Sequence, residues 1–218
     1  ITTTGGNEAN GGAITIDSAS GSVVINSSLV AIGGTDSGTD GGHSGGAVTI
    51  VIASGSGVIT FGAGADITTT GSDGGSGNNA GGAGGLVTLN TATQAITLND
   101  TAIDTSAGDA SGSGADAAGG AVTLSDAVTL ANGTVTITTG ATAGNILFSS
   151  TVNGARALTL TAGTGNITFS GIVGASAPLL LSTIASAGLV TAAAFSSAGL
   201  DWTATTEINT LGLVTSTA

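Results

Sequence analysis

The chain has 218 residues, of which 40 are glycine, one is proline and none is cysteine. Its net charge of −12 comes from 13 acidic residues and a single basic one, which excludes the phosphate contacts that nucleic acids and anionic membranes require. A hydrophobic content of 40% excludes disorder, and an aromatic content of 2% predicts a narrow core of Val, Ile and Leu.

The first segment, residues 1–4, reads Ile-Thr-Thr-Thr and recurs at residues 67–70. Residues 67–70 close one repeat of the pattern described next, so we predict that the chain enters its fold part-way through a repeat. Residues 1–20 lack the basic and apolar regions of a secretory signal peptide. We therefore expect a piece of a longer, processed protein.

A six-residue motif, Gly-Gly-x-[Ile/Val]-Thr-[Ile/Leu], then occurs four times, starting at residues 11, 45, 84 and 119. Two further short runs follow each copy, and in them apolar residues alternate with Thr or other small residues, which is typical of half-buried strands. Three such strands bury no core alone, but stacked repeats pair every backbone group. The sequence thus predicts an all-β parallel solenoid with three short strands per rung, a rung being one turn of the stack.

Stacking in register predicts continuous columns of side chains. Two inward columns and one outward column are expected on the first strand: Ile14, Val48, Val87 and Val122; Ile16, Ile50, Leu89 and Leu124; and outward Thr15, Thr49, Thr88 and Thr123.

Each of the first repeats is longer than three strands need, and the surplus lies before the next Gly-Gly pair. We expect three Gly-rich acidic loops, near residues 33–43, 71–84 and 108–119, to project from one corner. After residue 140 the loops disappear, and residues 144–148 match residues 165–169. This divides the chain into loop-bearing rungs (1–143) and shorter, loop-free rungs with an apolar end (144–218). Residues 179–218 are either degenerate rungs or a packing surface.

The chain resembles the repeat regions of filamentous-haemagglutinin-like and other giant β-strand-repeat bacterial surface proteins. The shared features are the Gly-Gly-Ala-Val-Thr-Leu strands, the turn at residues 103–108 and the segment at 161–171. The resemblance covers about residues 1–178. It implies a right-handed β-helix, secretion to the cell surface and a structural or adhesive role, and it carries over no catalytic residue.

The acidic loops are the candidate metal site, because Ca²⁺ takes six to eight oxygen ligands that Asp, Asn and carbonyl groups supply. Residues 36–42, Asp-Ser-Gly-Thr-Asp-Gly-Gly, have the spacing of a cation loop but lack the closing Glu of an EF-hand. A solvated, flexible loop is the alternative. The candidate ligands are Asp36, Asp40, Asp73, Asp109 and Asp116.

The remaining polar residues indicate neither a catalytic site nor a metal site. His43 has no second His or Cys to share a metal and is expected in a surface loop. Arg156 is expected to pair with a carboxylate or a carbonyl. Without a lysine or a second arginine, an enzyme of the polysaccharide-lyase type is not expected, and we predict no catalysis and no cofactor besides possible Ca²⁺.

A Thr-x-Thr array for ice binding occurs at Thr68/Thr70 and Thr136/Thr138, but Ala31 and Asp104 interrupt it.

The functional prediction is a secreted structural protein that assembles with copies of itself, end to end, into a filament or surface fibre. The alternative is a ligand- or Ca²⁺-binding segment of a long adhesin, with a surface or matrix polysaccharide as a further partner. Trp202 is expected to pack rather than to bind sugar, and no polar cap is expected at Ala218. The predicted assembly residues are Ile1, Thr2, Thr3, Thr4, Leu179, Leu180, Leu181 and Trp202.

Overall fold

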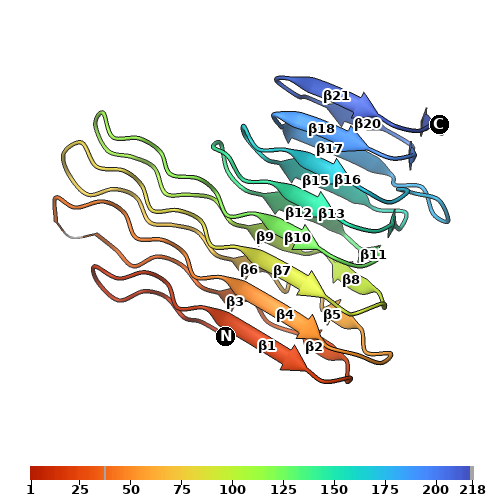
Figure 1. The fold of residues 1–218 in the computed structure, drawn as a ribbon, viewed down its shortest axis with the longest axis horizontal. Helices are drawn as coiled ribbons and strands as arrows, with labels where there is room; N and C mark the ends of the chain where they lie inside the picture. The colour runs from red at the N-terminus through yellow and green to blue at the C-terminus, as the bar shows by residue number, and fades with distance from the viewer. Residues whose placement is uncertain (37, 217–218) are drawn as a thin grey trace.

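The structure is a computed structural model that describes residues 1–36 and 38–216. In this part of the chain all regular structure is β, and every strand pair is parallel (Figure 1). The strands stack into three sheets along one axis, because each turn of the chain places its three strands directly above those of the previous turn. The predicted parallel β-solenoid is confirmed.

The first sheet contains the strand of each rung that follows the Gly-Gly pair. Its eight strands are, in order, β1 (Ile14–Ser18), β4 (Val48–Ile52), β7 (Val87–Asn90), β10 (Val122–Leu124), β13 (Ile146–Phe148), β16 (Ile167–Phe169), β18 (Leu189–Ala192) and β21 (Glu207–Thr210). This sheet passes through residue 143 without a break, so the loop-bearing and loop-free rungs form one continuous stack.

The second sheet also has eight levels in the described residues. Five are β2 (Val23–Ile25), β5 (Ile59–Phe61), β8 (Ile96–Asn99), β11 (Val128–Asn132) and β14 (Val152–Asn153). Val173 supplies the sixth level through parallel bridges to Val152 and Phe195. The last two are β19 (Phe195–Ser197) and β22 (Val214–Ser216).

The third sheet completes each rung. It holds β3 (Leu29–Val30), β6 (Ile67–Thr68), β9 (Ala102–Asp104), β12 (Thr134–Thr138), β15 (Ala157–Thr161), β17 (Leu181–Ser186) and β20 (Leu200–Trp202). Thr2 forms a parallel bridge with Val30 on the free side of β3. Residues 1–4 thus occupy a third-strand position part-way through a rung, as the sequence predicted, and give this sheet an eighth level.

The predicted columns are confirmed by the register of the first sheet. Ile14, Val48, Val87 and Val122 are direct partners on successive strands, and so are the Thr residues that follow them. The four apolar side chains are buried, whereas the four Thr side chains lie on the outer face. Burial of the apolar columns along the axis supplies the core that no single rung could form.

Toward the C-terminus large rings fill this core. Phe148 and Phe169 stack with their centroids 5.0 Å apart, and Phe195 meets Phe169 edge-on at 5.3 Å. Trp202 continues the series, 4.7 Å from Phe195. Residues 179–216 therefore form further rungs, which decides between the two alternatives left open for this region.

A buried threonine closes the corner where the loops leave the stack. Thr69 and Thr105 are buried, and each hydroxyl donates to the carbonyl of the second glycine of the next Gly-Gly pair, Gly85 or Gly120. The amide of the same glycine donates back to the threonine carbonyl. Thr139 repeats the side-chain bond with Gly144. This reciprocal clamp joins the end of one rung to the beginning of the next.

Candidate functional site: a glycine-rich wing and two open edges

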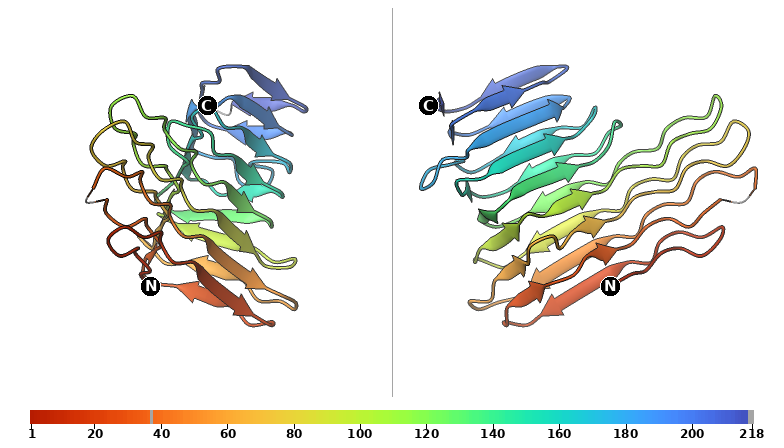
Figure 2. Two further views of the ribbon diagram at one scale, coloured as in Figure 1. Left: turned by 60° about the vertical axis from the view of Figure 1, so that its left-hand side comes forward. Right: turned by 180° about the vertical axis from the view of Figure 1, so that it is seen from behind.

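Four loops lie side by side and project from the corner between the third and first sheets (Figures 1 and 2). We call them together the wing: residues 5–10, 33–46 without residue 37, 71–85 and 106–119. The three predicted long loops thus project from one corner, and the shorter loop at residues 5–10 joins them. The rungs after residue 140 lack this extension.

The loops of the wing are hydrogen-bonded to one another rather than free in solvent. Their bonds recur every three residues along each limb of a loop, and they connect it to limbs in neighbouring rungs. Examples are Gly71 N to Ser106 O followed by Gly74 N to Asp109 O, and Ser72 N to His43 O followed by Gly75 N to Asp40 O. Three residues is the repeat of an extended polyproline II helix, whereas a strand repeats every two. The limbs of the wing thus pack on one another in this threefold repeat, and the alternative of a flexible, solvated loop stays a prediction.

Glycine is required in the wing because the limbs lie in backbone contact. A Cβ atom on Gly33 or Gly82 would overlap the carbonyl of His43, and one on Gly108 would overlap the carbonyl of Ser72. None of these three glycines has a positive φ, so close approach, and not backbone conformation, selects glycine there. Collagen uses glycine for the same reason where its chains crowd together.

The carboxylates of the wing accept hydrogen bonds from backbone amides. Asp36 accepts from Gly38 through Oδ1 (2.8 Å) and from Gly75 in the next rung through Oδ2 (2.9 Å). Asp73 accepts from the amide of Asp109, again one rung further, at 2.9 Å. Asp116 accepts from Ala110 within its own loop. These side chains therefore join or shape neighbouring loops.

The five predicted calcium ligands do not converge. Within residues 1–36 and 38–216, no three His, Cys, Asp or Glu side chains lie close enough together to hold a metal ion. Ser37, in the middle of the predicted cation loop, lies outside the described residues. Calcium binding stays a prediction, and the geometry gives the carboxylates a structural role beside it.

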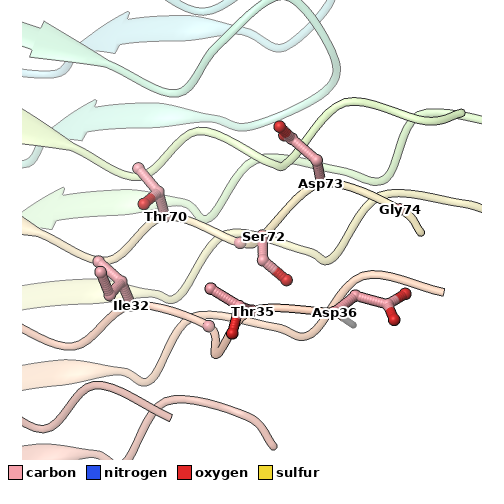
Figure 3. Close-up of a pocket in the computed structure, with 9 residues that line it drawn as sticks. Ile32, Thr35, Asp36, Thr70, Ser72, Asp73 and Gly74 are labelled. Carbon is pink, nitrogen blue, oxygen red and sulfur yellow. The ribbon is translucent and has the colours of Figure 1, made fainter. Parts of the chain in front are cut away.

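A shallow groove of about 410 Å³ runs between the outgoing limbs of two loops (Figure 3). Its polar side chains are Thr35, Asp36, Thr70, Ser72 and Asp73, and its lining has no basic or aromatic residue. Such a surface offers hydroxyl and carboxylate acceptors but neither a cation nor an aromatic ring.

His43 and Arg156 are held within the fold. His43 Nε2 lies 3.4 Å from Glu8 Oε2 in the neighbouring loop, and its side chain is 18% exposed. The Arg156 Nε donates to the carbonyl of Ala131 at 3.0 Å, and Nη1 donates to the carbonyl of Ala155. The prediction that Arg156 pairs with a carbonyl is confirmed.

The C-terminal edge of the stack leaves its core open. Ile208 continues the buried column of Val190 but is 43% exposed, since no described rung covers it. Leu211 and Leu213, between β21 and β22, are each 73% exposed. Trp202 on β20 is half-buried.

At the opposite edge, β1 and β2 have no described strand beneath them. Ile1 is 61% exposed there. Among residues 1–36 and 38–216, the first and last strands of the stack therefore have one edge without a partner strand, with apolar side chains next to it.

The predicted assembly residues are divided between these edges and other places. Residues 1–4 lie at the N-terminal edge, and Trp202 lies at the C-terminal edge. Leu179 is fully buried, so its side chain belongs to the core and is not available to a partner. Leu180 and Leu181 are exposed, but they lie one rung below β20, at the beginning of β17. Ala218 lies outside the described residues.

No family model, curated protein or solved structure matches this chain. The resemblance to filamentous-haemagglutinin-like repeats therefore stays a prediction. In the described residues there is also no helical segment with the length and apolarity of a membrane span. A functional proposal for this chain therefore rests on its fold and its surface.

Sequence reasoning missed two features of this site. The buried threonines had a signal, because strand alternation after Ile67 and Ile103 places Thr69 and Thr105 inward. The packing of the wing had a weaker sequence signal, which is the high density of glycine. A high density of glycine is equally typical of flexible linkers.

Proposed function

We propose that this chain is a non-catalytic structural module of an extracellular fibre or stalk, which extends by adding rungs at its open edges. The observation that carries the proposal is the exposure of Ile208, an inward-facing residue of the first sheet, at the end of an otherwise buried column. Further rungs, from a second copy or from the same longer chain, would cover it.

Free parallel edges favour such extension. In the described part of the chain, each edge strand has a row of backbone donors and acceptors without a partner strand, and such rows template pairing with another strand. The uncovered apolar side chains add a hydrophobic contribution, about 25 cal/mol for each Å² removed from water. Stacking of repeats in a solenoid combines both terms at every rung.

A structural role also agrees with the chemistry of the surface. The single Arg is held by two backbone carbonyls. The groove in the wing has hydroxyl and carboxylate side chains but no Lys, Arg or His, so it lacks the basic residue expected of a polysaccharide lyase. Secretion to the cell surface is proposed from the sequence resemblance alone.

The test is electron microscopy and light scattering of the 218-residue protein over a range of concentrations. We expect filaments, and we expect Ile208→Asp to abolish them, because stacking would bury its charge without a partner. The matched control is Leu86→Asp, which changes a lateral residue that is 57% exposed. Circular dichroism would establish that both variants are folded.

Trp202 provides a second readout, since it is the sole tryptophan of the chain and lies at the C-terminal edge. Assembly should bury it and move its emission to shorter wavelength as concentration rises, but not in Ile208→Asp. Monomeric particles at every concentration would overturn self-assembly.

A further inference from the structure

The threonine clamp closes the corner of the stack over loops of very different length. The hydroxyl of Thr105 donates to the carbonyl of Gly120, which lies 15 residues later, across a long loop of the wing. The hydroxyl of Thr139 donates to the carbonyl of Gly144, which lies only 5 residues later, in a rung without a wing loop. The corner therefore has the same closing bond whether or not a wing loop follows the threonine.

The wing contributes no residue to the hydrophobic core of the described chain. The core residues stop at Ile67 and resume at Val87, and they stop again at Ile103 and resume at Val122. The loops between them project away from the three sheets (Figure 2). The apolar columns of the stack therefore stay buried when the wing leaves its place.

The limbs of the wing are held less strongly than the strands of the stack. Backbone hydrogen bonds join the limbs, and the net contribution of each is small because an open limb bonds to water instead. Glycine also loses more conformational freedom on ordering than any other residue, which favours the open form. The strands have the same kind of hydrogen bond and, in addition, the buried apolar columns. The limbs should therefore open before the strands separate.

The loops of the wing depend on one another. The amide of Gly74 donates to the carbonyl of Asp109 in the next rung, and the amide of Gly42 in the previous rung donates to the carbonyl of Ala80. A loop that detaches thus removes donors or acceptors from the loops on both of its sides. Segments coupled in this way open together as a cooperative unit.

We propose that the wing is a conformational device that opens and closes as one unit while the threonine clamps keep the stack closed. This inference goes beyond the proposed function, since it concerns the side of the stack and not its edges. In the closed form Asp36 and Asp73 accept amides of neighbouring loops. In the open form the same loops become acidic arms anchored to the stack at both ends, and their carboxylates are released from those amides.

Native-state hydrogen exchange tests this device, read amide by amide by NMR at a concentration at which the protein is monomeric. In the unmodified chain the amides of Gly42, Gly74 and Gly108 should be protected, because each donates to a carbonyl of another loop. Their protection factors should be equal, since one opening exposes all three, and lower than those of the slowest amides of β10 and β16.

The variant Ile167→Val separates opening of the wing from unfolding of the stack. It shortens a fully buried side chain of β16 and should lower the protection of the slowest strand amides by about 3- to 10-fold. Protection of the wing amides should not change, because β16 has the same packing in the open and closed forms of the wing. The control is Thr168→Ala, on the outer face of the same strand, which should change neither set of amides.

A second variant replaces residues 106–119 by the short turn of residues 140–143. Circular dichroism should show that the rungs still form, because the Thr105 clamp then closes over the short spacing found in the next rung. The acceptor of Gly42, the carbonyl of Ala80, remains in this variant. The Gly42 amide should nevertheless exchange more than about 10-fold faster, because the cooperative unit has lost the hydrogen bonds of a whole loop.

Three outcomes would overturn the device. Wing amides that lose protection together with the strand amides in Ile167→Val would show that the wing opens only when the stack unfolds. Wing amides without protection in the unmodified chain would show that the wing has no closed form, and unequal protection factors would show that it is not one unit. Failure of the shortened chain to form rungs would show that the clamps do not close the stack without the wing.

Discussion

The two halves of the stack maintain one register by different means. In the winged half, residues 1–120, Val, Ile and Leu fill the core, with Phe61 as the one ring, and the glycine-rich limbs add a second body held by backbone hydrogen bonds. In the plain half, residues 121–216, short turns replace the limbs and a series of packed rings fills the core. The comparison shows that rung spacing does not depend on one kind of interior.

In the plain half, the largest loss of stability is expected from removing an aromatic ring from the core. Phe169→Ala should lower the free energy of unfolding by about 3–5 kcal/mol, because Phe169 contacts both Phe148 and Phe195 and its loss leaves a cavity. Chemical denaturation followed by circular dichroism measures the change. Thr168→Ala, on the outer face of the same strand, is the control and should shift stability by less than about 0.5 kcal/mol.

In the winged half the corresponding weak point is a glycine, not a ring. Gly108→Ala should cost about 1–3 kcal/mol, because the new methyl group overlaps the carbonyl of Ser72 in the adjacent loop. Gly6→Ala is the matched control, since a Cβ there has no neighbour within 4 Å. Equal unfolding curves for the two variants would show that the limbs are not packed as described.

The threonine clamp lies at the corner where the wing joins the stack, so a variant there tests how the two parts are held together. Thr105→Val keeps the shape but removes the hydroxyl that bonds the Gly120 carbonyl, and it should cost about 1–2 kcal/mol. Thr123→Val removes an outward hydroxyl and should be nearly neutral, since valine suits a strand. If thermal or chemical denaturation ranks the two variants in the reverse order, the clamp does not stabilise the corner.

The smallest expected effect concerns calcium. With the carboxylates of Asp36, Asp73 and Asp116 accepting backbone amides, we expect Tm to be the same with EDTA as with added CaCl₂. Scanning calorimetry in both buffers measures it. A higher Tm in CaCl₂ that Asp36→Asn abolishes would instead establish the calcium site predicted from the sequence.

Much of the fold could be predicted because the stack repeats its own pattern. The Gly-Gly motif and the alternation of Ile or Val with Thr identify rungs, strands and inward columns, and the register aligns Val48 with Val87 as expected. Alternation is a local property of a strand, since successive side chains point to opposite faces. The position of residues 1–4 in the third sheet followed from the same local pattern.

The roles within the candidate site could not be predicted in the same way. Asp36 has the composition of a cation ligand, but which group meets its carboxylate depends on a loop 39 residues further along the chain. Leu179 belongs to an apolar run that was predicted to form an assembly surface, but its side chain is buried in the core. Neighbours in adjacent rungs, not the local sequence, decide both.

The sequence by itself therefore determined the solenoid, its three strands per rung and the corner from which the loops project, because strand periodicity and repeat spacing are written along the chain. Only the tertiary structure decided that the hydrogen bonds between limbs recur every three residues and that Thr105 clamps the corner. Those features arise from contacts between rungs, where the position of a group depends on three neighbouring segments at once.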